Sequence, residues 1–124
     1  MTPSRIARNQ LAAFKSRNFP AMETILDGDA VLETGALGYQ PVHGREEIIR
    51  ILRESAMFDK EILQTIDLDD RFCITVSSER YRVTRGWAQS NSIVHLVETR
   101  DGTFVRSWRC RNVEHARLLR QQLG

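Results

Sequence analysis

The sequence has few of the features that would assign it to a special class of protein. Its 124 residues include two cysteines, Cys73 and Cys110, which lie outside any CxxC or Cys/His cluster, so a zinc site is not expected. No apolar run approaches the ~20 residues of a membrane-spanning helix, and the N-terminal segment lacks a signal-peptide core. We therefore expect free thiols, a cytoplasmic location, no membrane partner, and neither metal nor cofactor.

Lysine is scarce and the charge is nearly balanced. Lys15 and Lys60 are the two lysines among 18 basic residues, which oppose 16 acidic residues and give a net charge of +2. The arginines are scattered along the chain, so nucleic acid is not an expected partner. The apolar fraction of 41% and the charged fraction of 27% are typical of a globular protein. The length predicts a single domain over residues 1–124.

Four helices are indicated by caps and by apolar periodicity. Thr2 and Pro3 begin the first helix, and Asn18 begins a short second helix that we expect to end at Gly28. Residues 44–57, GREEIIRILRESAM, form a strongly amphipathic pattern with acidic residues in the first turn. Asn112 is placed to cap a final helix.

Strands dominate the second half of the chain. Alternating patterns predict a short early strand and four later ones, at residues 29–35, 60–68, 71–85, 90–100 and 103–112. Asp101-Gly102 is a strong hairpin signal between the last two strands. This order predicts an α+β fold, in which the N-terminal helices pack on the concave face of a curved, mostly antiparallel sheet. Such a cone can enclose a pocket.

Strand alternation groups several polar residues on one predicted wall of this pocket. That set contains Arg80, Arg82, His95, Trp108 and Cys110. The opposite, more apolar set, which we expect on an exterior left uncovered by the helices, contains Val83, Val94, Leu96 and Val105. A shift of one residue in register would exchange the two faces.

Each member of the polar set has a functional and a structural interpretation. His95 could carry protons near neutral pH or be a hydrogen-bonded core histidine. Arg80 and Arg82 could bind anionic or carbonyl oxygens through their forked donors, or pair with nearby acids. Trp108 and Cys110 could line the pocket or fill the core.

Three stretches carry a resemblance to a known superfamily. They are DAVLETG followed by HGREEIIRIL, then SSERYRV, then DGTFVRSWRCRN. Their order and spacing resemble the cone-shaped nuclear transport factor 2-like and SnoaL-like proteins, and within them the limonene-epoxide hydrolase branch. The resemblance implies a pocket between sheet and helices and a homodimer formed through the outer sheet face.

The resemblance also shows which reaction to exclude. The family uses two aspartates bridged by an arginine, and that arginine corresponds to Arg80. Arg82 and Cys110 occupy the aspartate positions, so both carboxylates are missing. Arginine stays protonated and cannot act as a base. We therefore do not expect epoxide hydrolysis by the family mechanism.

Other positions follow from the same resemblance. Leu32 and Thr34 stand where the family holds its water, and Tyr39 and His43 lie on a loop that could close over the pocket or cap the next helix. Steroid isomerisation would need an early-strand carboxylate, but Glu33 is expected to face away.

Two functions remain open from the sequence. In the first, the protein binds a hydrophobic oxygenated or anionic small molecule and is a cofactor-free isomerase, cyclase, hydro-lyase or hydrolase. In that case His95 would carry the proton, with Arg80 and Arg82 stabilising an oxyanion. In the second, it is a non-catalytic ligand-binding or dimer-scaffold protein. Whether it is an enzyme stays undecided at this point.

Overall fold

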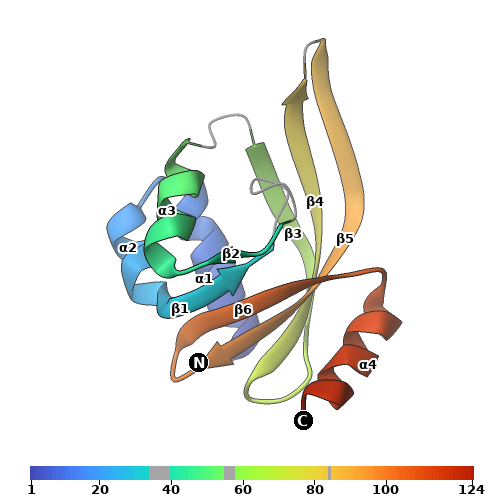
Figure 1. The fold of residues 1–124 in the computed structure, drawn as a ribbon. Helices are drawn as coiled ribbons and strands as arrows, with labels where there is room; N and C mark the ends of the chain where they lie inside the picture. Colours follow the sequence, from blue (N-terminus) through green and yellow to red (C-terminus); the bar gives the residue numbers. More distant parts are fainter. Residues whose placement is uncertain (34–39, 55–57, 84) are drawn as a thin grey trace.

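A six-stranded sheet with helices on both faces makes up the fold (Figure 1). The computed structural model describes residues 1–33, 40–54, 58–83 and 85–124, without the side chains of residues 58 and 81–83. The helices described are α1 Pro3–Lys15, α2 Phe19–Ile25, α3 Arg45–Glu54 and α4 Val113–Leu123. The strands are β1 Leu26–Leu32, β2 Val42–His43, β3 Phe58–Asp67, β4 Phe72–Val83, β5 Gly86–Arg100 and β6 Thr103–Cys110.

The sheet has the strand order β2-β1-β6-β5-β4-β3. Strands β3 to β6 form an antiparallel meander, as the sequence predicts. Strand β1 extends the sheet beyond the meander by pairing parallel to β6, and β2 pairs antiparallel to β1. The predicted α+β class with a mostly antiparallel sheet is confirmed.

Local sequence signals determine most of the element ends. The side chains of Thr2, Asn18 and Asn112 each accept a hydrogen bond from a main-chain N–H in the first turn of their helix, which confirms all three predicted caps. Asp101 and Gly102 both have positive φ, as a tight hairpin turn between β5 and β6 requires. Gly28, in contrast, lies inside β1, so the prediction that it ends the second helix is wrong.

Both faces of the sheet are covered. Helices α1, α2 and α3 pack on what we call the inner face, where Cys73, Val97 and Phe104 join their apolar side chains. Helix α4 packs on the outer face over Phe72, Ile74, Val94, Leu96 and Cys110. The expectation that helices leave the outer face bare is therefore wrong, because Val94 and Leu96 lie beneath α4.

Strand pairing is interrupted between β1 and β6 and at three places in the β3–β6 meander, and the three in the meander alter which side chains face inward. Leu63 of β3 is an extra residue relative to β4, because Ile62 pairs with Ser77 and Gln64 pairs with Val76. A second shift lies in β5, where Ser92 has a φ of 58°. Each extra residue reverses the alternation beyond it and bends the strand locally.

The third interruption lies in β6. Glu98 pairs with Arg106 and Thr99 with Phe104, so Val105 is the extra residue. As a result, Phe104 and Ser107 face the same side although they are three positions apart. Simple alternation instead groups Phe104 with Arg106.

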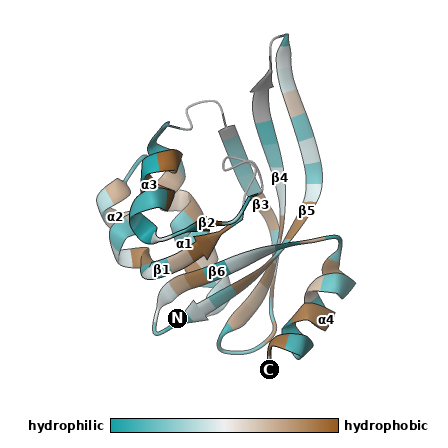
Figure 2. Cartoon of the chain, in the orientation of Figure 1, coloured by the Kyte–Doolittle hydropathy of each residue, from teal (hydrophilic) through white to brown (hydrophobic). Residues whose placement is uncertain are grey.

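The β4–β5 hairpin extends beyond the helices as an arm (Figure 1). The first seven residues of β5, from Gly86, are exposed. In Figure 2 this arm is mostly teal and white, whereas brown segments lie along β1 and α4. The apolar core is therefore confined to the part of the sheet that the helices cover.

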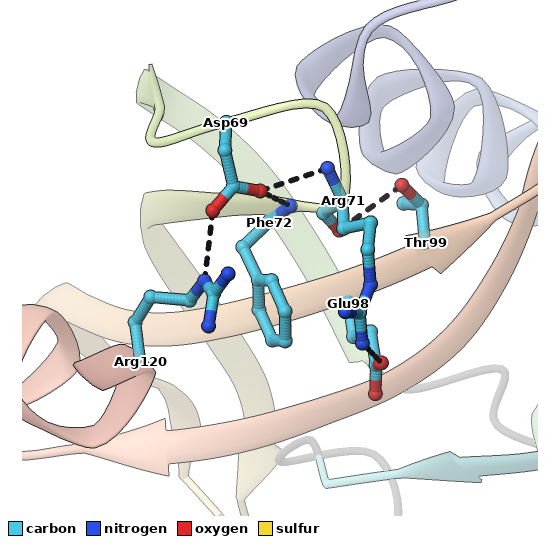
Figure 3. Close-up of polar contacts among 6 residues, drawn as sticks. All are labelled: Asp69, Arg71, Phe72, Glu98, Thr99 and Arg120. Carbon is cyan, nitrogen blue, oxygen red and sulfur yellow. Dashed lines mark hydrogen bonds and ion pairs between the residues drawn. The ribbon is translucent and has the colours of Figure 1, made fainter. Parts of the chain in front are cut away.

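Helix α4 is fastened to the β3–β4 turn by a cluster of charged groups (Figure 3). The Arg120 Nε donates to one carboxylate oxygen of Asp69 at 2.8 Å. The other Asp69 oxygen accepts from the N–H groups of Arg71 and Phe72, each at 2.8 Å. The guanidinium of Arg120 also lies 4.1 Å from the centre of the Phe72 ring, a cation–π contact.

These contacts set the charge state of Asp69. Partial burial alone would raise the pKa of Asp69, but hydrogen bonds from the main chain of Arg71, from Arg120 and from the main chain of Phe72 lower it below 3.8. A lowered carboxylate pKa stabilises the fold above the pKa of the unfolded state, and this stabilisation is lost as the pH falls through the lower folded value.

We expect Arg120→Ala to lower the free energy of unfolding by about 1–2 kcal/mol at pH 7, because it removes both the ion pair with Asp69 and the contact with Phe72. Urea denaturation measures the change. Arg117→Ala, at an exposed position of the same helix, is the matched control and should change stability by less than about 0.5 kcal/mol. Equal stability of the two variants would show that the cluster does not hold α4.

Candidate functional site

A small cavity lies between α1 and the inner face of the sheet. Its volume is about 30 Å³, enough for a water-sized group. Its lining combines apolar side chains with several polar ones: Ala7, Gln10, Leu11, Leu32, Glu33, Lys60, Ile62, Thr75, His95, Val97, Phe104 and Ser107. A larger hollow of about 500 Å³ between α2 and α3 is lined mainly by charged side chains. Buried polar groups distinguish the smaller cavity.

His95 lies in the centre of the sheet on the inner face. It pairs directly with Thr75 of β4 and with Arg109 of β6, and directly opposed residues project to the same face. The residue is 1% exposed. Among the described residues, neither ring nitrogen has a hydrogen-bond partner. A buried polar side chain left in this state costs about 1–3 kcal/mol, so the position is unfavourable for folding alone.

The environment keeps the His95 ring neutral. Burial lowers its pKa well below 6.5, and the positive charges of Lys60 and Arg109 lower it further. The main-chain carbonyl of Glu33 acts in the opposite direction but does not reach good hydrogen-bond geometry. At neutral pH the ring therefore offers one N–H donor and one bare nitrogen acceptor.

A buried ion pair adjoins the histidine. Lys60 pairs with Glu79 across β3 and β4, with 3.7 Å between the Lys60 Nζ and a carboxylate oxygen. The Lys60 side chain is 16% exposed and that of Glu79 is fully buried. Burial lowers the pKa of Lys60, whereas Glu79 raises it and Arg109 lowers it, and the net shift is downward.

Glu33 borders the same cavity, so the prediction that it faces away is wrong. Its carboxylate accepts a hydrogen bond from the Arg109 main-chain N–H at 3.0 Å and lies 4.0 Å from the Arg106 guanidinium. The main-chain N–H of Glu33 donates to the Ser107 hydroxyl at 3.0 Å. These bonds join the end of β1 to β6 and hold an acidic side chain at the cavity.

The predicted wall that grouped His95 with Trp108 and Cys110 is wrong. Leu96 pairs with Trp108 and Val94 with Cys110, so both residues face outward under α4. The Trp108 ring stacks with Phe72 at 6.4 Å, and burial raises the pKa of Cys110. The prediction differs from the structure by one residue of register between strands, and this exchanges the two faces. Alternation within single strands does not determine that register.

Arg80 also lies away from the cavity. It pairs with Gln89, one position past the inward-facing Glu79, and its guanidinium lies 4.8 Å from the ring centre of exposed Trp87. The predicted cooperation of Arg80 with His95 is therefore wrong. The side chain of Arg82 lies outside the described residues, as do Thr34 and Tyr39. Leu32 lines the cavity and is 6% exposed.

Sequence reasoning did not identify Lys60, Thr75 and Ser107 as cavity residues, nor Glu79 as the partner of Lys60 beside the cavity. A signal was present for Lys60 and Glu79, because a lone lysine in one strand and a glutamate in the next can pair across a hairpin. The sequence places Trp108 inward and therefore Ser107 outward, whereas the pairing of Ser107 with Val97 turns Ser107 inward.

The described residues offer no group of three or more His, Cys, Asp or Glu side chains placed to hold a metal ion. None of the described helices is long and apolar enough to cross a membrane. Glu33, Lys60 and His95 line the cavity, and the ion pair of Lys60 with Glu79 lies beside it.

Comparisons with known proteins agree on the fold. No family model and no curated protein sequence matches this chain. Among solved structures, an LEH-like epoxide hydrolase from M. tuberculosis is similar over 99% of this chain and 92% of its own, at 20% identity and a TM-score of 0.71. A computationally designed 17-OHP binder is similar over 93% and 97%, at 8% identity and 0.71.

A third similar structure contains a ligand. It is a protein of ketosteroid isomerase-like fold from Catenulispora acidiphila, in complex with trimethylamine, which matches over 94% of this chain and 91% of its own at 17% identity and a TM-score of 0.68. The chain thus has the nuclear transport factor 2-like, SnoaL-like fold that the sequence motifs predict. At these identities the likeness establishes the fold.

We expect His95→Leu to raise the free energy of unfolding at pH 7 by about 1 kcal/mol or more, because leucine fills the site without two unsatisfied polar atoms. Leu96→Ala, one position along the strand on the outer face, is the control and should lose about 2–5 kcal/mol. A loss of similar size in His95→Leu would show that the histidine is a stabilising core residue.

A comparison of the wild type with His95→Leu at different pH values tests the pKa of His95. Since the folded-state pKa is below the unfolded value of about 6.5, protons favour the unfolded state as the pH falls below that value. The wild type should therefore lose stability below pH 6.5 relative to His95→Leu, by up to about 1.4 kcal/mol per pH unit. A constant difference between pH 5 and 8 would contradict the lowered pKa.

Proposed function

We propose that the protein binds a small, largely apolar molecule whose polar oxygen enters the cavity of the inner face, and that His95 transfers a proton to or from this molecule. The observation that carries this proposal is the buried imidazole without a hydrogen-bond partner among the described residues, in a cavity lined partly by apolar side chains. A bound carbonyl or hydroxyl group would supply the missing partner. Its binding would recover free energy that the empty fold lacks.

A neutral imidazole suits cofactor-free isomerisation, cyclisation or the addition of water. It removes a proton from one position and returns it to another, and a lowered pKa makes that return easy. Lys60 would donate a hydrogen bond to the substrate oxygen on which negative charge develops, in the place of the Arg80 and Arg82 that the sequence predicts. The acidic side chain of Glu33 borders the same space.

The similar structures support this choice without fixing the reaction. One is described as an LEH-like epoxide hydrolase, and another holds trimethylamine. Arg82 and Cys110 still occupy the positions of the family carboxylates, and Cys110 lies on the outer face. Epoxide hydrolysis by the family mechanism is therefore not part of the proposal.

The second candidate is a binding protein without catalysis. The small volume of the cavity, about 30 Å³, favours recognition of one polar group of a ligand, and the similar designed 17-OHP binder illustrates such a use of this fold. Product formation distinguishes the two functions.

We expect epoxides, lactones, enones or steroids whose polar oxygen reaches the cavity to raise the thermal midpoint, since a ligand that binds the folded state stabilises it by mass action. His95→Leu should remove the shift and any turnover, whereas Leu96→Ile, on the outer face, should retain both. Turnover that survives His95→Leu would eliminate the proton-transfer role. Binding without product would favour the non-catalytic protein.

We also propose a cytoplasmic homodimer, supported by two buried free thiols and by the resemblance. Helix α4 already covers Val94 and Leu96, so the contact would use sheet outside this area, including the arm that carries exposed Trp87. Sedimentation at micromolar concentration should give twice the monomer mass. A monomer would refute the dimer but leave the cavity proposal intact.

A further inference from the structure

We propose that Lys60 is a nucleophilic amine that forms an imine with small aldehydes or ketones whose carbonyl group enters the cavity. The inference deepens the proposed function, because both require a ligand to reach the same cavity. It adds a covalent activity and names carbonyl compounds as the ligand class. Three features support it: the position of Lys60 on the cavity wall, its buried surroundings, and a neutral histidine on the same wall.

The position of Lys60 follows from the pairing of β3 with β4. Lys60 pairs with Glu79, and Ile62 pairs with Ser77, so both Lys60 and Ile62 face the inner side. Lys60 and His95 both line the cavity, and they are close enough for a positive charge on Lys60 to lower the pKa of His95. A carbonyl group in the cavity would therefore contact an amine and an imidazole together.

The surroundings of Lys60 favour a reactive amine. A nucleophilic lysine must lose its proton, and burial among apolar side chains makes this easier. Burial lowers the pKa of Lys60 in spite of the opposing effect of Glu79, and Arg109 adds to the lowering. The ion pair with Glu79, at 3.7 Å, opposes this lowering and positions the amine at the cavity wall.

The reaction balances with groups already in the cavity. The neutral amine of Lys60 attacks the carbonyl carbon and forms a C–N bond. His95 transfers one proton from the nitrogen to the oxygen, which gives a carbinolamine. His95 then transfers the second amine proton to the hydroxyl group, the C–O bond breaks, water leaves, and a neutral imine remains. No oxidant or reductant takes part, and hydrolysis reverses the sequence.

The second lysine of the chain provides an internal comparison. Lys15 lies at the end of α1 with a side chain 45% exposed, and it pairs with Asp59 at the same 3.7 Å distance that separates Lys60 from Glu79. The two amines thus differ mainly in burial and in access to the cavity. Because the sequence contains only these two lysines, the reactivity of Lys60 can be measured against a single exposed lysine in the same molecule.

The test uses propanal with sodium cyanoborohydride at pH 7, which reduces each imine to a stable N-propyl group. Peptide mass spectrometry then gives the labelling rates of Lys60, Lys15 and the N-terminal amine. We expect Lys60 to be labelled severalfold faster than Lys15, because the lowered pKa of Lys60 leaves a larger share of its amine unprotonated. Unfolding in urea should equalise the two lysines.

Three variants complete the test. Lys60→Met should abolish the fast labelling, Lys15→Met should leave it unchanged, and His95→Leu should slow it without abolishing it. Labelling of Lys60 at the rate of Lys15 or slower in the folded wild type would overturn the proposal.

Propanamide, which has a similar shape but forms no imine, separates this proposal from the proposed function. Shifts in the NMR signals of cavity residues on adding propanamide, together with no labelling of Lys60, would overturn the imine alone. Neither shifts nor labelling would argue against both.

Discussion

The alternation of side chains along the curved sheet, interrupted at three places in the β3–β6 meander, determines what the cavity contains. The inner-face row Thr75, His95 and Arg109 is fixed by the pairing of β4 with β5 and of β5 with β6. The extra residues Leu63 and Val105 bring Ile62 and Phe104 onto the same side. A sheet with regular alternation would place other side chains around the histidine.

This arrangement buries polar groups that are unfavourable for stability. His95 and Glu79 are buried within the sheet, and Lys60 is largely buried beside them. The apolar cores on both faces offset their cost: α1, α2 and α3 cover the inner face, and α4 covers the outer face. Buried polar groups of this kind are common where a fold is adapted to bind or transform a ligand rather than for maximal stability.

Much of the fold could be predicted from local signals. Predictable features include the caps at Thr2, Asn18 and Asn112, the turn at Asp101-Gly102 and the strand meander. Each depends on residues that are close in sequence. The site is predictable only in part. The sequence identifies His95 as a candidate but places Trp108 and Cys110 beside it, although these two residues lie on the outer face. The reason is that register between strands depends on bulges and on the tertiary position of α4. Lys60 and Glu79 were missed because their pairing is a contact between strands.

The state of the His95 ring decides whether the cavity is a functional site or an ordinary part of the core. Nitrogen NMR of the three histidine rings across pH 4–8, with His95→Leu for assignment, measures it directly. The account predicts that the signal of His95 stays neutral well below pH 6.5 and shifts when a carbonyl or hydroxyl ligand is added. A ring that titrates near pH 6.5 and ignores every ligand would contradict it.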